Sequence, residues 1–211
     1  MFDLGPVMQD KSPYPNERYA WFVVGVLMIF YVFSFIDRTM LNLMVEPIKR
    51  DLKINDTQMS LLMGASFAIL YSILGLPFGR MADRYSRRVI IGAGLFAWTI
   101  LTAGCGIART YGQLFALRIG VGVGEATLSP CAYSMVADYF PPGKLGRALS
   151  AYGMGIFIGA GLALGVGGAI SGWAMRQESI SIPIFGTIFS WQLAFIIVGL
   201  AGLAPLGRDA K

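Results

Sequence analysis

Four ionisable side chains lie within long apolar stretches of this sequence: Asp37, Arg38, Arg118 and Glu125. Such a group in hydrocarbon costs roughly 3 kcal/mol or more unless it is paired or hydrated, so it marks an ion, proton or substrate site by default. An arginine stays charged and forms forked hydrogen bonds with phosphate and carboxylate groups. A carboxylate can take up and release a proton. The four residues therefore predict a site that binds an anion and exchanges protons.

Their spacing assigns a role to each. Arg118 and Glu125 are two helical turns apart and share a face, whereas Asp37 and Arg38 are adjacent and point about 100° apart, so they do not neutralise each other. We expect Arg38 to receive an anionic headgroup and Glu125 to exchange a proton, with Asp37 modulating Arg38 or carrying a second proton. The alternative is an ion-pair lattice between two helices that only holds a bundle together.

The composition places these residues in a membrane. Of the 211 residues, 55% are apolar and 14% are charged, against roughly a quarter charged in soluble domains. The apolar residues form long runs instead of amphipathic stripes. We predict six membrane spans over residues 19–43, 57–78, 89–108, 114–140, 149–173 and 191–206. The sixth is short and contains Pro205, and the connection 174–190 is moderately apolar.

The basic residues predict that both termini are cytoplasmic. On the inner side, ten are expected: Lys11, Arg18, Arg80, Arg84, Arg87, Arg88, Lys144, Arg147, Arg208 and Lys211. On the outer side, five are expected: Lys49, Arg50, Lys53, Arg109 and Arg176. This asymmetry accounts for the net charge of +5 without a nucleic-acid partner.

Glycines are dense in the fourth and fifth predicted spans, where small residues let helices approach closely. They are Gly120, Gly122, Gly124, Gly155, Gly159, Gly161, Gly165, Gly167 and Gly168. We expect them to pack helices, not to bind a dinucleotide, because no strand precedes them.

Other classes of site are disfavoured. The chain has no histidine, and both cysteines fall inside predicted spans, so neither a metal site nor a disulfide is expected. No cofactor is implied. An enzyme is disfavoured because Ser129 and Tyr133 have no histidine or lysine partner nearby. Residues 1–18 do not read as a signal peptide.

The segment GRMADRYSRR (79–88) resembles the motif between the second and third helices of major facilitator superfamily transporters. Gly79, Asp83, Arg84, Arg87 and Arg88 match, whereas a serine replaces the second glycine of the motif. In that family the loop helps to latch a cytoplasmic gate, with the aspartate against a neighbouring helix end and the arginines against acidic groups. A plain anchoring role for the arginines is the alternative.

Further segments narrow the resemblance to the spinster-like branch: FIDR (35–38), RIGVGVGEA (118–126) and ADYFPP (137–142). Members of that branch resemble carriers of lysolipids and sphingosine phosphates. After ADYFPP, Leu145 stands where the family commonly has an arginine, and the fifth span lacks the Gly-Pro pair that resembles the antiporter motif.

The resemblance implies an all-α membrane protein, a six-transmembrane-helix bundle that forms the N-terminal domain of the major facilitator fold from two inverted three-helix repeats. It divides the chain into a cytoplasmic tail (1–18), the six-helix domain (19–206) and the start of a cytoplasmic linker (207–211). A C-terminal six-helix half is expected from a longer protein or a partner.

The expected function is secondary active or facilitative transport across a plasma or bacterial inner membrane. The substrate would be a lysolipid-like, sphingolipid-like or other small organic anion, coupled to protons by alternating access. Sugar-phosphate or carboxylate symport is the alternative, because the Asp-Arg pair also occurs in those transporters. A membrane module that binds without transporting is a further alternative.

Overall fold

The computed structural model describes residues 14–176, 180–182 and 186–202. The description excludes residues 1–13 of the predicted N-terminal tail, and it also excludes Pro205 and the predicted linker 207–211. The helices are α1 (Glu17–Leu43), α2 (Val45–Leu52), α3 (Asp56–Ser60), the π-helical η1 (Leu61–Ala65), α4 (Ser66–Arg84), α5 (Arg87–Cys105), α6 (Tyr111–Glu125), α7 (Leu128–Tyr139), α8 (Pro142–Leu162), the π-helical η2 (Ala163–Gly167), α9 (Gly168–Arg176) and α10 (Ser190–Ala201). The strands β1 (Ile180–Ile182) and β2 (Gly186–Ile188) pair antiparallel.

All six predicted spans fall on helical segments, although their bounds differ. The first is α1, the second runs through α3, η1 and α4, and the third is α5. The fifth runs through α8, η2 and α9, and α10 is the short sixth. Among the described residues, four of these segments are long and apolar enough to cross a membrane unbroken. The second extends beyond its predicted end at residue 78 because α4 accommodates Pro77 within the helix.

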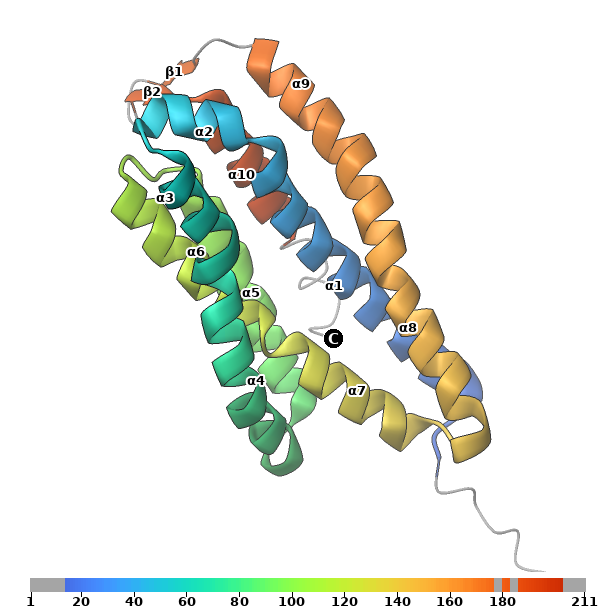
Figure 1. Cartoon of the computed structure of the whole chain (residues 1–211). Helices are drawn as coiled ribbons and strands as arrows, with labels where there is room; N and C mark the ends of the chain where they lie inside the picture. Colours follow the sequence, from blue (N-terminus) through green and yellow to red (C-terminus); the bar gives the residue numbers. More distant parts are fainter. Residues whose placement is uncertain (1–13, 177–179, 183–185, 203–211) are drawn as a thin grey trace, which may run out of the picture.

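The fourth span is not the continuous helix expected over 114–140. It consists of α6 and α7, which change direction between Glu125 and Leu128 (Figure 1). Pro130 accounts for the break, because its ring clashes with the carbonyl four residues earlier, at Ala126, and it has no N–H to donate. The break therefore leaves Glu125 as the last residue of α6.

Two elements outside the spans were not expected. The short helix α2 follows α1 and buries Ile48 in the same apolar cluster as Met40 and Met44. Its residues Glu46 and Arg50 are exposed, whereas the side chain of Asp51 is buried. The connection between α9 and α10 contains the β1–β2 hairpin, which lies at the same end of the molecule as α2 (Figure 1).

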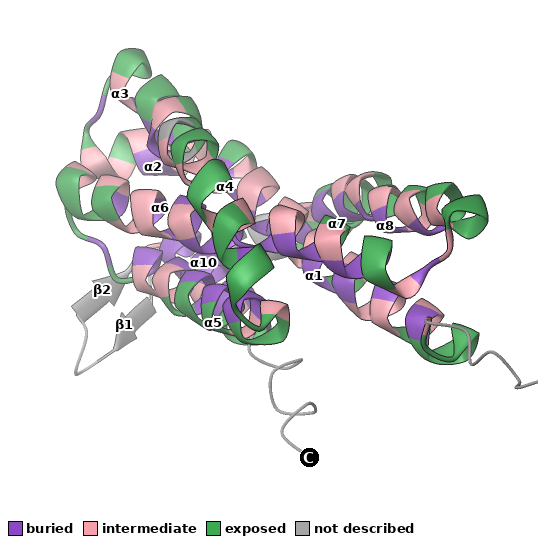
Figure 2. Ribbon diagram, turned by 90° about the horizontal axis from the view of Figure 1, so that it is seen from below, coloured by how far each residue is buried: buried purple, intermediate pink, exposed green. Residues whose placement is uncertain are grey.

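Two apolar clusters fill the interior. One contains Phe30, Leu95 and Trp98, and the other contains Met40 and Trp191. Along α1 and α5 the buried polar residues lie between these clusters: Ser34, Asp37, Thr99 and Thr102. Figure 2 shows much of α4 exposed, in contrast to the buried faces of α1 and α10. The fold thus positions a polar layer between two apolar clusters.

Some of the predicted glycine contacts are present. Gly155 and Gly159 of α8 pack against α1, where a Cβ would meet Met28, Val32 and Phe35 within 3.4 Å. Gly120 and Gly124 pack against α5, and Gly167 packs against α1. A Cβ at Gly161, Gly165 or Gly168 would meet nothing within 4 Å among the described residues, so these three do not pack helices in this half.

Replacing Gly159 by alanine tests the contact between α1 and α8. The added Cβ would lie 2.7 Å from Phe35 Cβ and 3.2 Å from Val32 Cα, so the helices must separate. We expect a loss of about 1–3 kcal/mol in stability, measured as a lower melting temperature in detergent. Gly161→Ala on the same helix is the matched control, and equal losses for both variants would contradict the packing.

Candidate functional site

The structure brings together the four ionisable residues from the apolar stretches as two ion pairs between α1 and α6. Arg118 Nη1 donates to Asp37 Oδ2 at 3.0 Å, and each side chain is 3% exposed. The Arg118 guanidinium also lies 5.7 Å from the centre of the Phe195 ring of α10. This pair is therefore enclosed by protein on all sides in this conformation.

The second pair is more accessible. Arg38 donates to Glu125 Oε2 through Nη2 at 2.7 Å and through Nε at 2.8 Å. The hydroxyl of Ser34 donates to the same oxygen at 2.5 Å. The Arg38 side chain is 29% exposed, whereas the Glu125 side chain is fully buried and its Oε1 has no hydrogen-bond partner. Of the four residues, Arg38 alone combines charge with access to a ligand.

Aromatic rings surround the Arg38 guanidinium. Its Cζ lies 5.2 Å from the centre of the Tyr71 ring and 5.6 Å from that of Phe35, within the range of cation–π attraction. The Tyr71 hydroxyl is 3.2 Å from Ser129 Oγ, which connects α4 to α7. These rings hold the guanidinium in place without adding a second negative charge.

An aromatic surface continues from this arginine. Phe35 contacts Tyr31 with ring centres 5.5 Å apart, and Tyr31 stacks on Tyr152 at 4.8 Å. Tyr133 meets Tyr152 edge-on at 5.5 Å and is 48% exposed. The rings therefore link α1, α7 and α8 next to the charged pair. Tyr152 is buried, but the exposed ring of Tyr133 can contact the apolar part of a ligand bound at Arg38.

Two arginines of the predicted cytoplasmic motif contact neighbouring helices. Arg87 donates to the Ala82 carbonyl at 3.0 Å and forms an ion pair with Asp138 of α7. Arg88 donates to the hydroxyls of Tyr19 at 2.6 Å and Tyr139 at 3.1 Å. These contacts tie the start of α5 to α1 and α7.

The other motif residues are not brought into this network. Asp83 and Arg84 are exposed and form no ion pair with the described residues, and a Cβ at Gly79 would meet nothing within 4 Å. Ser86, which replaces the second glycine, has φ −61° and ψ 112°, a conformation open to any residue. The turn therefore does not require glycine.

A further contact joins the ends of α1 and α8. Lys144 Nζ donates to Glu17 Oε2 at 2.7 Å. Leu145, where the family commonly has an arginine, packs instead against the first apolar cluster. Within the described part of the chain, no three metal-ligating side chains come together.

Ser34 and Tyr71 were not identified from the sequence. Ser34 lies one helical turn before Arg38, and this i, i+4 spacing could have placed its hydroxyl beside the pair. Tyr71 had no such signal, because its position depends on how α4 packs against α7.

Comparison with known proteins assigns the family. The sequence profile of the Major Facilitator Superfamily matches residues 27–205. The chain belongs to this superfamily and corresponds to its N-terminal half. It is accordingly an integral membrane protein, and its fold and its relatives are those of transporters and not of enzymes.

Several curated relatives are transporters. The chain is 31% identical over 93% of its length to an MFS-type efflux pump of Mycolicibacterium smegmatis, of which it covers 43%. It is 28% identical over 85% of its length to a probable L-galactonate transporter of Escherichia coli, of which it covers 36%. It is 27% identical over 86% of its length to the sphingosine-1-phosphate transporter SPNS2 of Xenopus tropicalis, of which it covers 38%.

A solved structure is similar in sequence and in fold. The inward-facing, unoccupied bacterial homologue of the human lysosomal transporter spinster superimposes with a TM-score of 0.81 at 32% identity. The match covers 90% of this chain and 42% of the other. The chain thus spans less than half the length of the relatives and of this structure.

The enclosed pair predicts a non-additive response to mutation. Arg118→Met leaves the Asp37 carboxylate buried without a counter-charge, and Asp37→Leu does the same to Arg118, so each single variant should lose about 3–5 kcal/mol. The double variant removes both charges and should be more stable than either single variant. Thermal unfolding in detergent measures the stability of the three variants. If the stability lost in the double variant equals the sum of the losses in the single variants, the two residues do not depend on each other as a buried pair.

Proposed function

We propose that the chain forms the N-terminal half of a proton-coupled transporter for an organic anion, with Arg38 as the anion-binding group and Glu125 as the proton carrier. The observation that carries this proposal is the Arg38–Glu125 pair itself, in which only the arginine is partly exposed. Arg38 is accessible and held by a carboxylate whose second oxygen is buried without a partner. A C-terminal six-helix half would complete the site, and both termini would be cytoplasmic.

The pair offers a direct route to coupling. An anion that binds Arg38 competes with Glu125 for the same guanidinium. Glu125 can hold a proton on Oε1 without losing its contacts at Oε2. Protonation removes the competing negative charge, and the anion then pairs with Arg38. Proton and anion therefore favour each other's binding, which is the linkage that symport needs.

An amphiphilic anion fits the surroundings of Arg38. Its charged headgroup would pair with the guanidinium, while its apolar part would lie along Tyr31 and the exposed ring of Tyr133. The likeness to the sphingosine-1-phosphate transporter and to the bacterial spinster homologue supports this class. A sugar acid is the second candidate, supported by the likeness to the probable L-galactonate transporter.

The proton role predicts the behaviour of Glu125→Gln. In the unmodified transporter, anion binding should strengthen as pH falls, because protonation of Glu125 frees Arg38. The glutamine variant has no proton to exchange, so its binding should be independent of pH and its transport should lose proton dependence. Binding and liposome flux at two pH values measure this. Glu46→Gln on the exposed face of α2 is the control, and pH dependence retained by Glu125→Gln would remove Glu125 from this role.

The anion role predicts the behaviour of Arg38→Ala. A hydrogen bond to a charged group contributes about 1.5–3 kcal/mol, so binding of an anion should weaken about ten- to a hundredfold. The assay is equilibrium binding of a lysophospholipid, L-galactonate and a neutral sugar to the complete transporter. Arg50→Ala on α2 is the matched control for charge, since its side chain is 73% exposed on the outer connection.

The same three ligands distinguish the two candidate substrate classes, the amphiphilic anion and the sugar acid. Binding of the lysophospholipid but not of galactonate supports the amphiphilic class, and the reverse result supports the sugar acid. Tight binding of the neutral sugar at both pH values would contradict Arg38 as an anion site. Ligand binding without flux in liposomes would favour a module that binds without transporting.

A further inference from the structure

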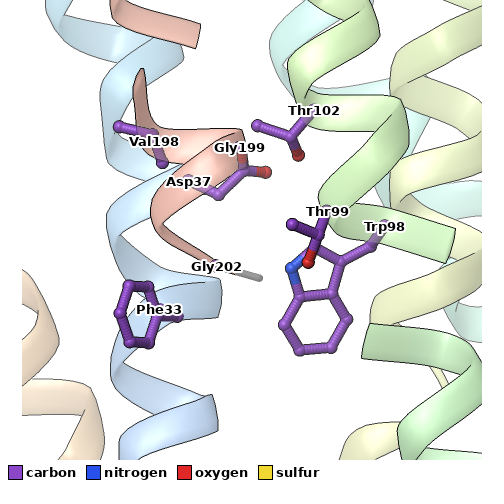
Figure 3. Close-up of a pocket in the computed structure, with 8 residues that line it drawn as sticks. All are labelled: Phe33, Asp37, Trp98, Thr99, Thr102, Val198, Gly199 and Gly202. Carbon is purple, nitrogen blue, oxygen red and sulfur yellow. The ribbon is translucent and has the colours of Figure 1, made fainter. Parts of the chain in front are cut away.

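A small cavity lies beside Asp37, between α1, α5 and the end of α10 (Figure 3). Its lining includes Asp37 of α1, Thr99 and Thr102 of α5, and Gly199 of α10. The volume open to the centre of a water molecule is about 10 Å³, which is close to the minimum that one water requires. A cavity of this size has room for one small guest.

Two buried polar atoms at this cavity have no hydrogen-bond partner. They are Asp37 Oδ1 and Thr102 Oγ1, from residues that are 2% and 1% exposed. Figure 3 shows Asp37 reaching from α1 towards Thr102 on α5. The other oxygen of Asp37 is taken by Arg118, so only Oδ1 is available to a guest. One side of the cavity therefore offers a strong acceptor and the other a hydroxyl.

Thr99 can supply a third partner. Its hydroxyl donates to the Leu95 carbonyl at 2.5 Å, which leaves the lone pairs of Oγ1 free to accept. A buried water ordinarily makes two to four hydrogen bonds to groups that would otherwise be unsatisfied. It can donate to Asp37 and to Thr99 and accept from Thr102.

Close approach of α10 to α5 keeps the cavity small. A Cβ at Gly199 would lie 2.5 Å from the Ala103 nitrogen, and one at Gly202 would lie 3.1 Å from Thr99 Cγ2. The position of Gly199 therefore requires glycine for α10 to approach this side of α5, whereas a Cβ at Gly202 would press on the Thr99 methyl group. The resulting space excludes a larger ligand.

Charge favours a neutral guest over a cation. Arg118 already pairs with the Asp37 carboxylate at 3.0 Å, so the group that would attract a metal ion is neutralised, and the same arginine would repel a second positive charge. We propose that this cavity is a water site in which a single water molecule bridges Asp37 Oδ1 and the Thr102 hydroxyl. The water ties the α1–α6 ion pair to α5.

The site lies apart from the proposed anion site. Asp37 and Arg38 are consecutive on α1 and point about 100° apart, and neither Arg38 nor Glu125 lines the cavity. The water is therefore a structural component of the transporter that substrate binding at Arg38 does not require. The inference stands whether or not the proposed function is correct.

The isosteric variant Thr102→Val tests this site through the sign of its effect. If a water bridges Asp37 and Thr102, valine removes one of its partners, and the melting temperature of the complete transporter should fall by several degrees. If the cavity is dry, the Thr102 hydroxyl is an unsatisfied buried group, and its removal should leave the melting temperature unchanged or raise it. The second outcome would overturn the proposal. Thr102→Ser keeps the hydroxyl and is the matched control, which should retain most of the stability.

Two further measurements keep the test decisive if the valine variant fails to fold. A structure of the unmodified transporter at a resolution that shows ordered waters should contain density between Asp37 Oδ1 and Thr102 Oγ1, and a dry cavity would overturn the proposal. The melting temperature should also be the same in sodium and in choline chloride. A sodium-dependent rise in the melting temperature of the unmodified transporter would indicate a cation in place of the water and would equally overturn the proposal.

Discussion

The arrangement depends on the pairing of charges that the membrane interior does not tolerate alone. Two consecutive residues of α1, Asp37 and Arg38, have opposite signs, and α6 provides the complementary signs in Arg118 and Glu125. Either helix by itself would carry two uncompensated charges in an apolar environment. Their mutual neutralisation therefore fixes both the contact of α1 with α6 and its register, because a slip of one turn would separate every charge from its partner. Around the Asp37–Arg118 pair, the burial of both side chains keeps bulk water from substituting for either partner.

The two pairs are chemically alike but differ in access. The Asp37–Arg118 pair is closed off, so it contributes to holding the bundle together, as a lattice of ion pairs would. In the Arg38–Glu125 pair, the arginine is partly exposed and Glu125 Oε1 has no hydrogen-bond partner, so each residue can bind a different partner. The two interpretations that the sequence left open are thus compatible: one pair suits the structural role and the other suits the binding role. Each pair joins a carboxylate to an arginine, so the difference in role follows from the difference in burial and not from the residue types.

The sequence predicted most of the fold because the length of an apolar run is a direct consequence of bilayer thickness. It also identified the four ionisable residues, since few such residues occur in apolar runs. It did not predict which carboxylate meets which arginine, because helix periodicity gives the face of a residue but not its depth relative to another helix. The break after α6 could have been expected from Pro130, and the missed helix α2 is too short and too charged to resemble a span. The aromatic neighbours of Arg38 come from distant segments, and only tertiary packing brings them together.

The conformation of Ser86 bears on how related chains are found. A negative φ at this position means that many amino acids can occupy the turn between α4 and α5 without strain. A search pattern that insists on glycine there would discard this chain, although Arg87 and Arg88 still make their contacts. A pattern built on the geometry would instead keep the basic pair and leave the preceding residue unspecified. Some transporters overlooked by the stricter rule should be recoverable in this way.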